Sequence, residues 1–294
     1  MSALARLLNL PALWRHLRAH RADRSVWDPA DDLELTLYGE MFGNNFLHYG
    51  YFHDPARDPK TIAFADLLQA MDEYASLLVQ RVQPGARVLD VGCGMGGLLA
   101  RLDAAGTRPT GVTPNLAHAA HIGRTWPHIP LLQSTLEALS EAQAPAGSFE
   151  AVINSESFQY IDLDAGMSRV RRLLAPGGRW INIDYFRLVP AARNQSGHLL
   201  TDFEHALARH GFTVRERLDV TDNVLPALGF AHLLATRIAL PLARFGTQRF
   251  FLKHPFWGYL FADAARARID GIRLHTIDPE QFRRDKRYIL FVLE

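Results

Sequence analysis

The sequence is poor in cysteine. Cys93 is the only one among 294 residues, so no disulfide can form within the chain. No unbroken run of apolar residues reaches the ~18 that a membrane-spanning helix needs, and we expect no such helix. The 32 Lys and Arg nearly balance the 31 Asp and Glu, so overall charge does not favour nucleic acid as a partner. The N-terminus lacks the unbroken apolar segment of a secretory signal, which predicts a cytoplasmic location.

Acidic residues are missing from two stretches of the chain. None occurs between Asp222 and Asp263, where Arg237, Arg244, Arg249 and Lys253 lie among apolar and aromatic residues. The first 22 residues are also free of acid and rich in arginine. Both stretches look basic and amphipathic, which leaves open a peripheral contact with an anionic membrane surface.

From residue 61 onward, short apolar strands alternate with segments whose apolar residues recur at helical spacing. We predict strands over 87–91, 108–113, 129–134, 149–155, 179–186, 213–220 and 287–294. We predict helices over 61–82, 96–105, 116–126, 163–178 and 201–212, preceded by helices over 2–20 and 28–43. This alternation predicts an α/β fold with a doubly wound, seven-stranded, Rossmann-like sheet.

The same pattern divides the chain into four segments. Residues 1–60 form an N-terminal helical segment with an aromatic lid loop, and residues 61–222 form the Rossmann-like core. Residues 223–286 form a helical lid, and residues 287–294 form the last strand of the core sheet.

The stretch VLDVGCGMGG, residues 88–97, follows the first strand and contains two overlapping glycine patterns. Gly92, Gly94 and Gly97 match the G-x-G-x-x-G loop that binds a dinucleotide. Gly92, Gly94 and Gly96 match a G-x-G-x-G loop. Glycines in such a turn let the backbone bend sharply and approach a ligand closely, so the pattern alone does not choose the cofactor.

Neighbouring residues favour the second pattern. Asp90 lies at the end of the strand, where a carboxylate suits loop amides or a cationic or hydroxyl-rich ligand better than a pyrophosphate. A nicotinamide site would have an acidic residue about 20 positions later, whereas this chain has Thr113 at the end of its second strand. Gly97 then simply begins the next helix.

Four motifs, VLDVGCGMGG, GVTPN, SFEAVINSESFQYI and LLAPGGRWINID, occur in an order that resembles the class I S-adenosylmethionine-dependent methyltransferases. The resemblance covers about residues 35–222. The upstream stretch LYGEMFGNNFLHYGYF is similar to an element of small-molecule members, including sugar O-methyltransferases and tocopherol-type C-methyltransferases. The resemblance implies S-adenosyl-L-methionine as cofactor and S-adenosyl-L-homocysteine as product.

The resemblance also implies which residues bind the cofactor. Gly92, Gly94 and Gly96 would form the loop, Cys93 would contribute its backbone, and Thr113 would face the ribose. The full predicted cofactor-binding set is Tyr38, Asp90, Gly92, Cys93, Gly94, Gly96, Thr113, Asn115, Thr135, Leu136 and Asn154. Thr135 stands where many relatives have an aspartate near the adenine amine, and Leu136 would offer its backbone N–H to the ring.

Three residues are candidates for catalysis. Glu156 matches the E-S-x-x-H motif of relatives, but Tyr160 stands at its histidine position. A tyrosine is a poor general base near neutral pH because its ordinary pKa is ~10. His48, in the N-terminal element that folds over the cofactor in similar enzymes, is the best candidate proton acceptor, and a structural role is its alternative.

The lid is rich in leucine and aromatic residues, which favours a small lipophilic acceptor such as a quinone, isoprenoid, natural product or lipid. The alternative is that these side chains pack the lid onto the core or onto the partner of a homodimer. The predicted acceptor-binding residues are Tyr51, Phe158, Tyr185, Phe186, His232, Trp257 and Tyr259. No ligand spacing suggests a metal, and none is predicted.

Three functions remain open from the sequence. The first is methyl transfer to oxygen or carbon of a small acceptor. The second is a cofactor-dependent reaction that couples methylation to cyclisation or cyclopropanation. The third is a non-catalytic scaffold of the same fold, against which the intact glycine loop argues.

Overall fold

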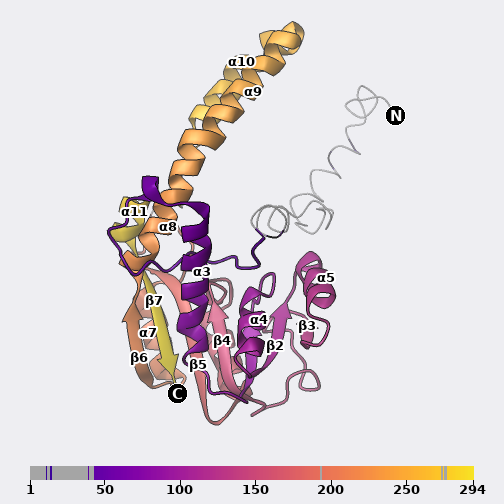
Figure 1. Ribbon diagram of the computed structural model, residues 1–294, viewed down its shortest axis with the longest axis vertical. Helices are drawn as coiled ribbons and strands as arrows, with labels where there is room; N and C mark the ends of the chain where they lie inside the picture. Colours follow the sequence, from indigo (N-terminus) through magenta and orange to yellow (C-terminus); the bar gives the residue numbers. More distant parts are fainter. Residues whose placement is uncertain are drawn as a thin grey trace.

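The computed structural model describes residues 11, 14, 39, 43–192, 194–272, 274 and 277–294. Tyr38 and most of the predicted helices over 2–20 and 28–43 lie outside the described residues. Within that part of the chain, the predicted alternation of strands and helices forms one sheet of seven strands, as expected (Figure 1).

The sheet has the strand order β3-β2-β1-β4-β5-β7-β6. Strands β3, β2, β1, β4 and β5 pair in parallel, and β7 runs antiparallel between β5 and β6. The strands are β1 (Arg87–Val91), β2 (Arg108–Thr113), β3 (Leu131–Gln133), β4 (Phe149–Ser155), β5 (Leu174–Arg187), β6 (Val214–Asp219) and β7 (Lys286–Leu293). The order reverses between β1 and β4, so their carboxyl ends form the switch point at which ligands bind in such sheets.

Helices cover both faces of the sheet. On one face, α6 and α7 bury Met167, Val170 and Phe203 against the strands. On the other, α3, α4, α8 and α11 contribute Tyr74, Leu98, Val224 and Phe282. The helices are α3 (Phe64–Val79), α4 (Gly97–Ala104), α5 (Leu116–Thr125), α6 (Leu163–Leu173), α7 (Leu200–Arg209), α8 (Thr221–Leu234), α9 (Leu240–Lys253), α10 (Pro255–Asp270) and α11 (Pro279–Asp285). Short 3-10 turns cover Pro59–Thr61 (η4) and Phe158–Tyr160 (η5).

The structure corrects the end of one helix. We predicted a helix over 163–178, but α6 ends at Leu173 and β5 begins at Leu174. The Pro-Gly-Gly turn therefore lies inside the strand segment, where Gly177 has a φ of 74° and the pairing with β4 shifts register. Because proline lacks the N–H for a helical bond and glycine tolerates positive φ, the chain leaves the helix before this turn.

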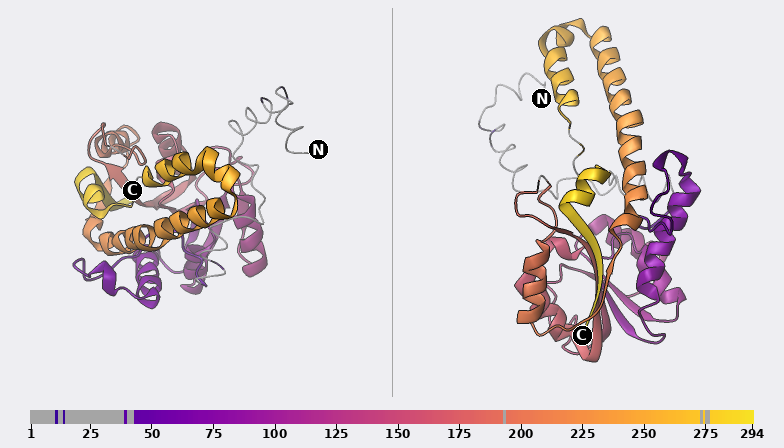
Figure 2. Two further views of the ribbon diagram at one scale, coloured as in Figure 1. Left: turned by 90° about the horizontal axis from the view of Figure 1, so that it is seen from above. Right: turned by 90° about the vertical axis from the view of Figure 1, so that its left-hand side faces the viewer.

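Helices α8 and α9 join through a π-helical turn, η6 (Ala235–Ala239), into one continuous helix. Pro241 is the second residue after this turn. A proline inside a helix removes one N–H donor and crowds the carbonyl four residues earlier, and a local widening of the helix relieves this conflict. The helix then continues to Lys253 and leaves the body of the protein (Figure 2).

Among the described residues, one helix is long and apolar enough to cross a membrane by length and composition, and it spans Thr221–Lys253. Our expectation from unbroken apolar runs did not include it. Isolated polar residues interrupt the run without abolishing its average apolar character. Its first part is buried against the sheet through Val224, Leu228 and their neighbours.

Candidate active site

A cavity of about 220 Å³ opens at the carboxyl ends of β1 and β4. Its floor comes from Asp90 and the glycine loop, and the loop around His48 closes one side. Glu156 and Tyr160, which follow β4, complete the wall. The structure thus brings together predicted residues from three separate parts of the sequence.

The glycine loop needs glycine for two reasons. Gly92, Gly94 and Gly96 have φ values of 75°, 53° and 88°, a region that other residues rarely adopt. A Cβ on Gly92 would also lie 2.5 Å from the Cβ of Ser157, and one on Gly96 would lie 2.9 Å from Trp126. The turn is held because the N–H groups of residues 92 and 93 donate to the carbonyl of Val112 at 2.8 and 3.1 Å.

Gly97 belongs to the helix, as predicted, because it is the first residue of α4 and has no positive φ. It also has a packing role that the sequence did not show. Its N–H donates to the carbonyl of Asn45 at 3.2 Å, and a Cβ would lie 2.7 Å from that oxygen. This contact holds the N-terminal loop against the glycine loop.

Asp90 is a buried carboxylate without a protein partner for one of its oxygens. Its side chain is 1% exposed, and Oδ2 has no hydrogen-bond partner among the described residues. Burial raises the pKa of Asp90 to about 7. A buried, unsatisfied anion at the cavity floor is costly, so the site is complementary to a cation or a hydrogen-bond donor.

Glu156 joins the loop after β4 to the N-terminal segment and to the last strand. Its Oε1 accepts from the Tyr49 N–H at 2.9 Å and from the Tyr288 hydroxyl at 2.6 Å. Neither bond uses Oε2, which is left for the cavity that Glu156 lines. Burial raises the pKa of Glu156 to about 7, and its φ of 52° is the only positive value of a non-glycine residue in the described part. Such strain persists only where surrounding contacts hold it.

Two buried tyrosines extend this network, and sequence reasoning missed both. The Tyr288 hydroxyl gives its proton to Glu156, so Tyr74 must donate to Tyr288, at 2.9 Å, and Ser155 to Tyr74, at 3.2 Å. Burial raises the pKa of both tyrosines well above the ordinary value, so both hydroxyls stay protonated. The sequence offered only a weak signal for these two residues. Each is a tyrosine, with a polar hydroxyl, among the apolar residues of a buried helix or strand face.

His48 is a neutral imidazole in this site. Its Nδ1 lies 2.8 Å from the carbonyl of Tyr49, which can only accept, so Nδ1 carries the proton. Its ring stacks on Tyr74 with centroids 3.9 Å apart, and Nε2 has no partner among the described residues. Burial lowers the pKa of His48 to about 4, which leaves Nε2 a free but weak acceptor.

A second cavity of about 180 Å³ adjoins the first and shares Gly92 and Tyr160 with it. Val112, Pro114 and Leu136 give it an apolar lining, and Thr135 lies at its edge. Tyr160, at the junction, is 79% exposed. A flat apolar ring with polar edges suits this second space.

Several predicted cofactor contacts are engaged elsewhere. Thr113 is buried and its hydroxyl accepts from the Asn115 N–H at 3.2 Å. Asn115 caps α5 by accepting from Ala117 and His118. Asn154 is fully buried, accepts from the Trp180 indole at 3.0 Å and donates to Ser157 at 2.9 Å. Cys93 is also buried. In this structure, helix capping and core hydrogen bonding therefore account for the observed contacts of Thr113, Asn115 and the Asn154 amide, and their predicted cofactor roles stay predictions.

Three of the predicted acceptor-binding aromatics are buried in this structure. Phe158 and Phe186 are each 1% exposed and pack in the core against Phe203, because η5 turns Phe158 inward and Tyr160 outward. Tyr185 is buried beneath the Lys286 ammonium at 4.3 Å. Packing decides which face of a strand or turn is inside.

The other predicted acceptor residues lie away from both cavities. Tyr51 lines a separate hollow with His53 and Arg57, and His232 lies on α8. Trp257 and Tyr259 lie on α10, in the projecting part of the molecule, and are 49% and 92% exposed. None of the four lines either cavity described above.

Asp184 is a further buried acid that the sequence analysis did not single out. It accepts from the N–H groups of Gln159, at 3.0 Å, and Tyr185, at 2.9 Å. Burial, followed by the nearby Glu156 charge, raises its pKa to about 8. It holds the turn that carries Tyr160. Among the described residues, no group of three or more His, Cys, Asp or Glu side chains is placed to hold a metal ion.

The chain is similar to known proteins. The pattern of a methyltransferase domain matches residues 88–178. An O-methyltransferase of Pyrenophora dematioidea is 30% identical over 168 residues, which is 49% of this chain and 58% of that protein. An S-adenosyl-L-methionine-dependent Diels–Alderase of Talaromyces variabilis is 23% identical over 79% of this chain and 87% of its own.

The fold is shared with solved structures. The [4+2]-cyclase SpnF superposes with a TM-score of 0.64 at 20% identity, covering 89% of this chain and 92% of that one. The chain spans a little over half the length of the O-methyltransferase it matches. The seven-stranded methyltransferase fold predicted from the sequence is therefore confirmed.

Proposed function

We propose that this chain, which carries a class I methyltransferase domain, is an enzyme that uses S-adenosyl-L-methionine to methylate a small lipophilic molecule. One observation carries the proposal. The positive-φ glycine turn and the buried, partly unpartnered carboxylate of Asp90 line the same cavity at the switch point of the sheet. The product of the cofactor is S-adenosyl-L-homocysteine.

The residues present fit this cofactor. The amino acid portion and sulfonium would lie over the glycine loop, where Asp90 provides negative charge next to a cation. The apolar second cavity, with Leu136 and Thr135, would hold the adenine. When bound, the cofactor supplies an electrophilic methyl group on a positively charged sulfur.

The protein itself positions the acceptor and excludes water from the site. It also accepts the proton that the acceptor loses. The segment around His48 covers the cavity and is fixed by the Glu156 bond to Tyr49 and the Gly97 bond to Asn45. Asp90 and Glu156 both have a pKa of about 7; because Asp90 is assigned to the cofactor, Glu156 is the acid-base group left for the acceptor. His48, with its pKa lowered to about 4, orients the site rather than accepting the proton.

The acceptor is a small lipophilic molecule, with transfer to oxygen favoured over carbon. Residues 61–222 act as the cofactor-binding core with 287–294 as its last strand, and residues 223–286 carry apolar surface for acceptor entry. The enzyme is cytoplasmic, and self-association as a homodimer is compatible with its apolar surface.

Calorimetry with S-adenosyl-L-methionine and S-adenosyl-L-homocysteine tests this proposal. We expect saturable binding of both, and transfer of label from methyl-labelled cofactor to lipophilic molecules in an extract. If neither compound binds, both the cofactor assignment and the enzyme assignment are contradicted.

A second candidate is a ring-closing enzyme that uses the cofactor without consuming it. The similarity to the Diels–Alderase over 79% of this chain favours it. Under this alternative an extract component is converted while no S-adenosyl-L-homocysteine forms. Stoichiometric S-adenosyl-L-homocysteine would favour methyl transfer.

The affinity for S-adenosyl-L-methionine is expected to fall about tenfold between pH 8 and pH 6. Asp90, with its pKa raised to about 7, loses its charge opposite the cation over this range. Calorimetry in matched buffers measures the change. Asp90→Asn should bind weakly at both pH values and remove the dependence, and a variant that keeps it would place the titrating group elsewhere.

The ligand-free protein should show the opposite trend. Because the pKa of Asp90 is higher in the folded state than in the unfolded chain, folding favours the protonated form. The contribution of Asp90 to stability is therefore greatest below the unfolded pKa of ~4 and declines as the pH rises toward about 7, so it is measured as the difference between the original chain and Asp90→Asn. Thermal melts across this range, without cofactor, distinguish the folding effect from the binding effect.

A further inference from the structure

The helical hairpin formed by α9 and α10 leaves the body of the protein. The two helices pack antiparallel and extend beyond the end of the sheet (Figures 1 and 2). No residue of either helix is buried. Large apolar side chains are instead exposed, and those on α9 and α10 are Leu242, Phe245, Phe250, Leu252, Phe256, Trp257, Tyr259, Leu260 and Phe261.

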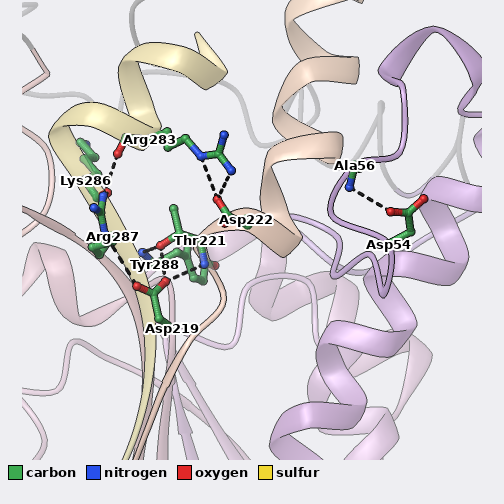
Figure 3. A network of polar contacts seen from close by, with 9 residues as sticks. All are labelled: Asp54, Ala56, Asp219, Thr221, Asp222, Arg283, Lys286, Arg287 and Tyr288. Atoms are coloured by element: carbon green, nitrogen blue, oxygen red, sulfur yellow. Dashed lines mark hydrogen bonds and ion pairs between the residues drawn. The ribbon is translucent and has the colours of Figure 1, made fainter.

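The base of this hairpin is firmly attached. Asp219 accepts from the backbone N–H of Thr221, at 2.9 Å, and from its hydroxyl, which in turn accepts from the Tyr288 N–H at 2.9 Å (Figure 3). Arg283 on α11 donates twice to Asp222 in the first turn of α8, at 2.9 and 2.7 Å. These contacts fix the start of α8 to the body of the protein, and the exposed apolar residues of α9 and α10 therefore lie at the far end of a firmly attached helix.

We define the hairpin tip as residues 250–261, FFLKHPFWGYLF. It contains phenylalanine, tryptophan and tyrosine but no acid. Tyr259 is 92% exposed and Leu252 is 78% exposed. Tryptophan and tyrosine prefer the boundary between water and hydrocarbon, because their rings are apolar and their edges donate hydrogen bonds.

The charge around the tip is positive. Lys253 lies within it and Arg249 lies one residue before it, and no acid occurs between Asp222 and Asp263. Asp270, at the far end of α10, is already paired with Arg244 at 3.0 Å. Basic residues flanking exposed aromatics are the pattern of a surface that binds anionic lipid headgroups.

We propose that the hairpin tip docks on a membrane surface that contains anionic lipids. The hairpin lies at the interface and does not span the bilayer. The apolar helix over Thr221–Lys253 cannot cross as a unit, because its α8 part is packed on the sheet. The unburied part of this helix, the 5 residues of η6 and the 14 of α9, carries Arg237, Arg244, Arg249 and Lys253. Arginine and lysine side chains are costly at the centre of a bilayer.

A second copy of the chain fits the tip less well. Residues 240–270 carry Arg244, Arg249, Lys253, Arg266 and Arg268 against only Asp263 and Asp270. A symmetric dimer that paired this surface with itself would bring like charges together around the aromatics. An anionic lipid surface supplies the missing negative charge.

Flotation of the full-length protein with lipid vesicles tests the proposal. We expect it to bind vesicles of phosphatidylcholine mixed with phosphatidylglycerol at least about tenfold more strongly than phosphatidylcholine alone, and to release in high salt. Lys253→Gln should weaken binding about fivefold. Equal binding to both vesicle types, or no binding to either, would overturn the proposal.

The tip is tested with Phe256→Ser/Tyr259→Ser, whose side chains are 68% and 92% exposed. We expect this variant to lose vesicle binding on the order of tenfold or more, with unchanged melting temperature and cofactor affinity. Val214→Ser, an exposed apolar residue on β6 in the body, is the matched control and should bind as the original chain does. Undiminished binding by the double variant would contradict the proposal.

If the double variant misfolds, two further measurements still test whether the hairpin tip binds lipid. Brominated lipid should quench tryptophan fluorescence in the original chain, and Trp257→Phe should remove most of this quenching. Retained quenching in Trp257→Phe would show that another segment binds lipid. A dimer in sedimentation velocity that Lys253→Gln strengthens, without vesicle binding, would identify a second copy as the occupant and overturn the proposal.

Discussion

Replacing Gly94 by valine is expected to weaken binding of S-adenosyl-L-methionine by a factor on the order of 100. Gly94 has a φ of 53°, which a β-branched residue adopts only under strain. The loop would relax by rotating the backbone away from the cavity. A Cβ at this position also lies 3.1 Å from Leu47, in the segment that covers the site. Calorimetry with the purified variant measures the loss.

Gly106→Val is the matched control for this substitution. Gly106 also has a positive φ, of 75°, but nothing lies within 4 Å of an added Cβ. It lies between α4 and β2, at the opposite end of the strands from the cavity. We expect this variant to lose stability but to keep its affinity for the cofactor. Equal affinity in Gly94→Val and the original chain would refute the assignment of the loop.

Glu156→Gln is expected to lower kcat by a factor of ~10² to ~10⁴, with little change in cofactor affinity. The amide oxygen of glutamine can still accept from Tyr49 and Tyr288, so the positioning bonds survive. The substitution removes the group able to take a proton. Because the pKa of Glu156 is raised to about 7, the rate of the original enzyme should rise with pH through about 7. The variant should lack that rise.

Glu156→Ala and Glu204→Gln complete this comparison. Alanine removes both the proton acceptor and the bonds to Tyr49 and Tyr288, so stability should fall as well as turnover. Glu204 is a surface acid on α7 near Arg217, and its change to glutamine should leave turnover intact. Full activity in Glu156→Gln, with loss in Glu156→Ala, would limit Glu156 to positioning. The methyl group would then be transferred without general base catalysis by Glu156.

The glycine loop and the order of elements could be predicted because their causes are local. Gly92, Gly94 and Gly96 follow an apolar strand, and only glycine adopts their backbone angles without cost. The alternating apolar periods likewise report which segments are strands and which are helices. The start of strand β5 was not predicted correctly. A Pro-Gly-Gly turn is typical of the end of a helix, but here the helix already ends at Leu173 and the turn lies within the strand segment.

The site around Glu156 could not be predicted in the same way. Its partners Tyr49 and Tyr288 are separated from it by 107 and 132 positions, and no local pattern links them. Tyr288 reaches Glu156 only because β7 inserts antiparallel between β5 and β6. That packing buries the carboxylate of Glu156 and so raises its pKa to about 7, into the range of a general base at neutral pH.

The sequence by itself determined the fold class, the seven strands and the glycine loop after β1, since each depends on backbone sterics and on the period of apolar residues. Tertiary structure decided which aromatic side chains face inward. Phe158 fills the core whereas Tyr160, two residues later, faces the cavity. It also decided that the aromatic residues of α10 project into solvent. Burial depends on neighbours distant in the chain, and a one-dimensional pattern does not contain them.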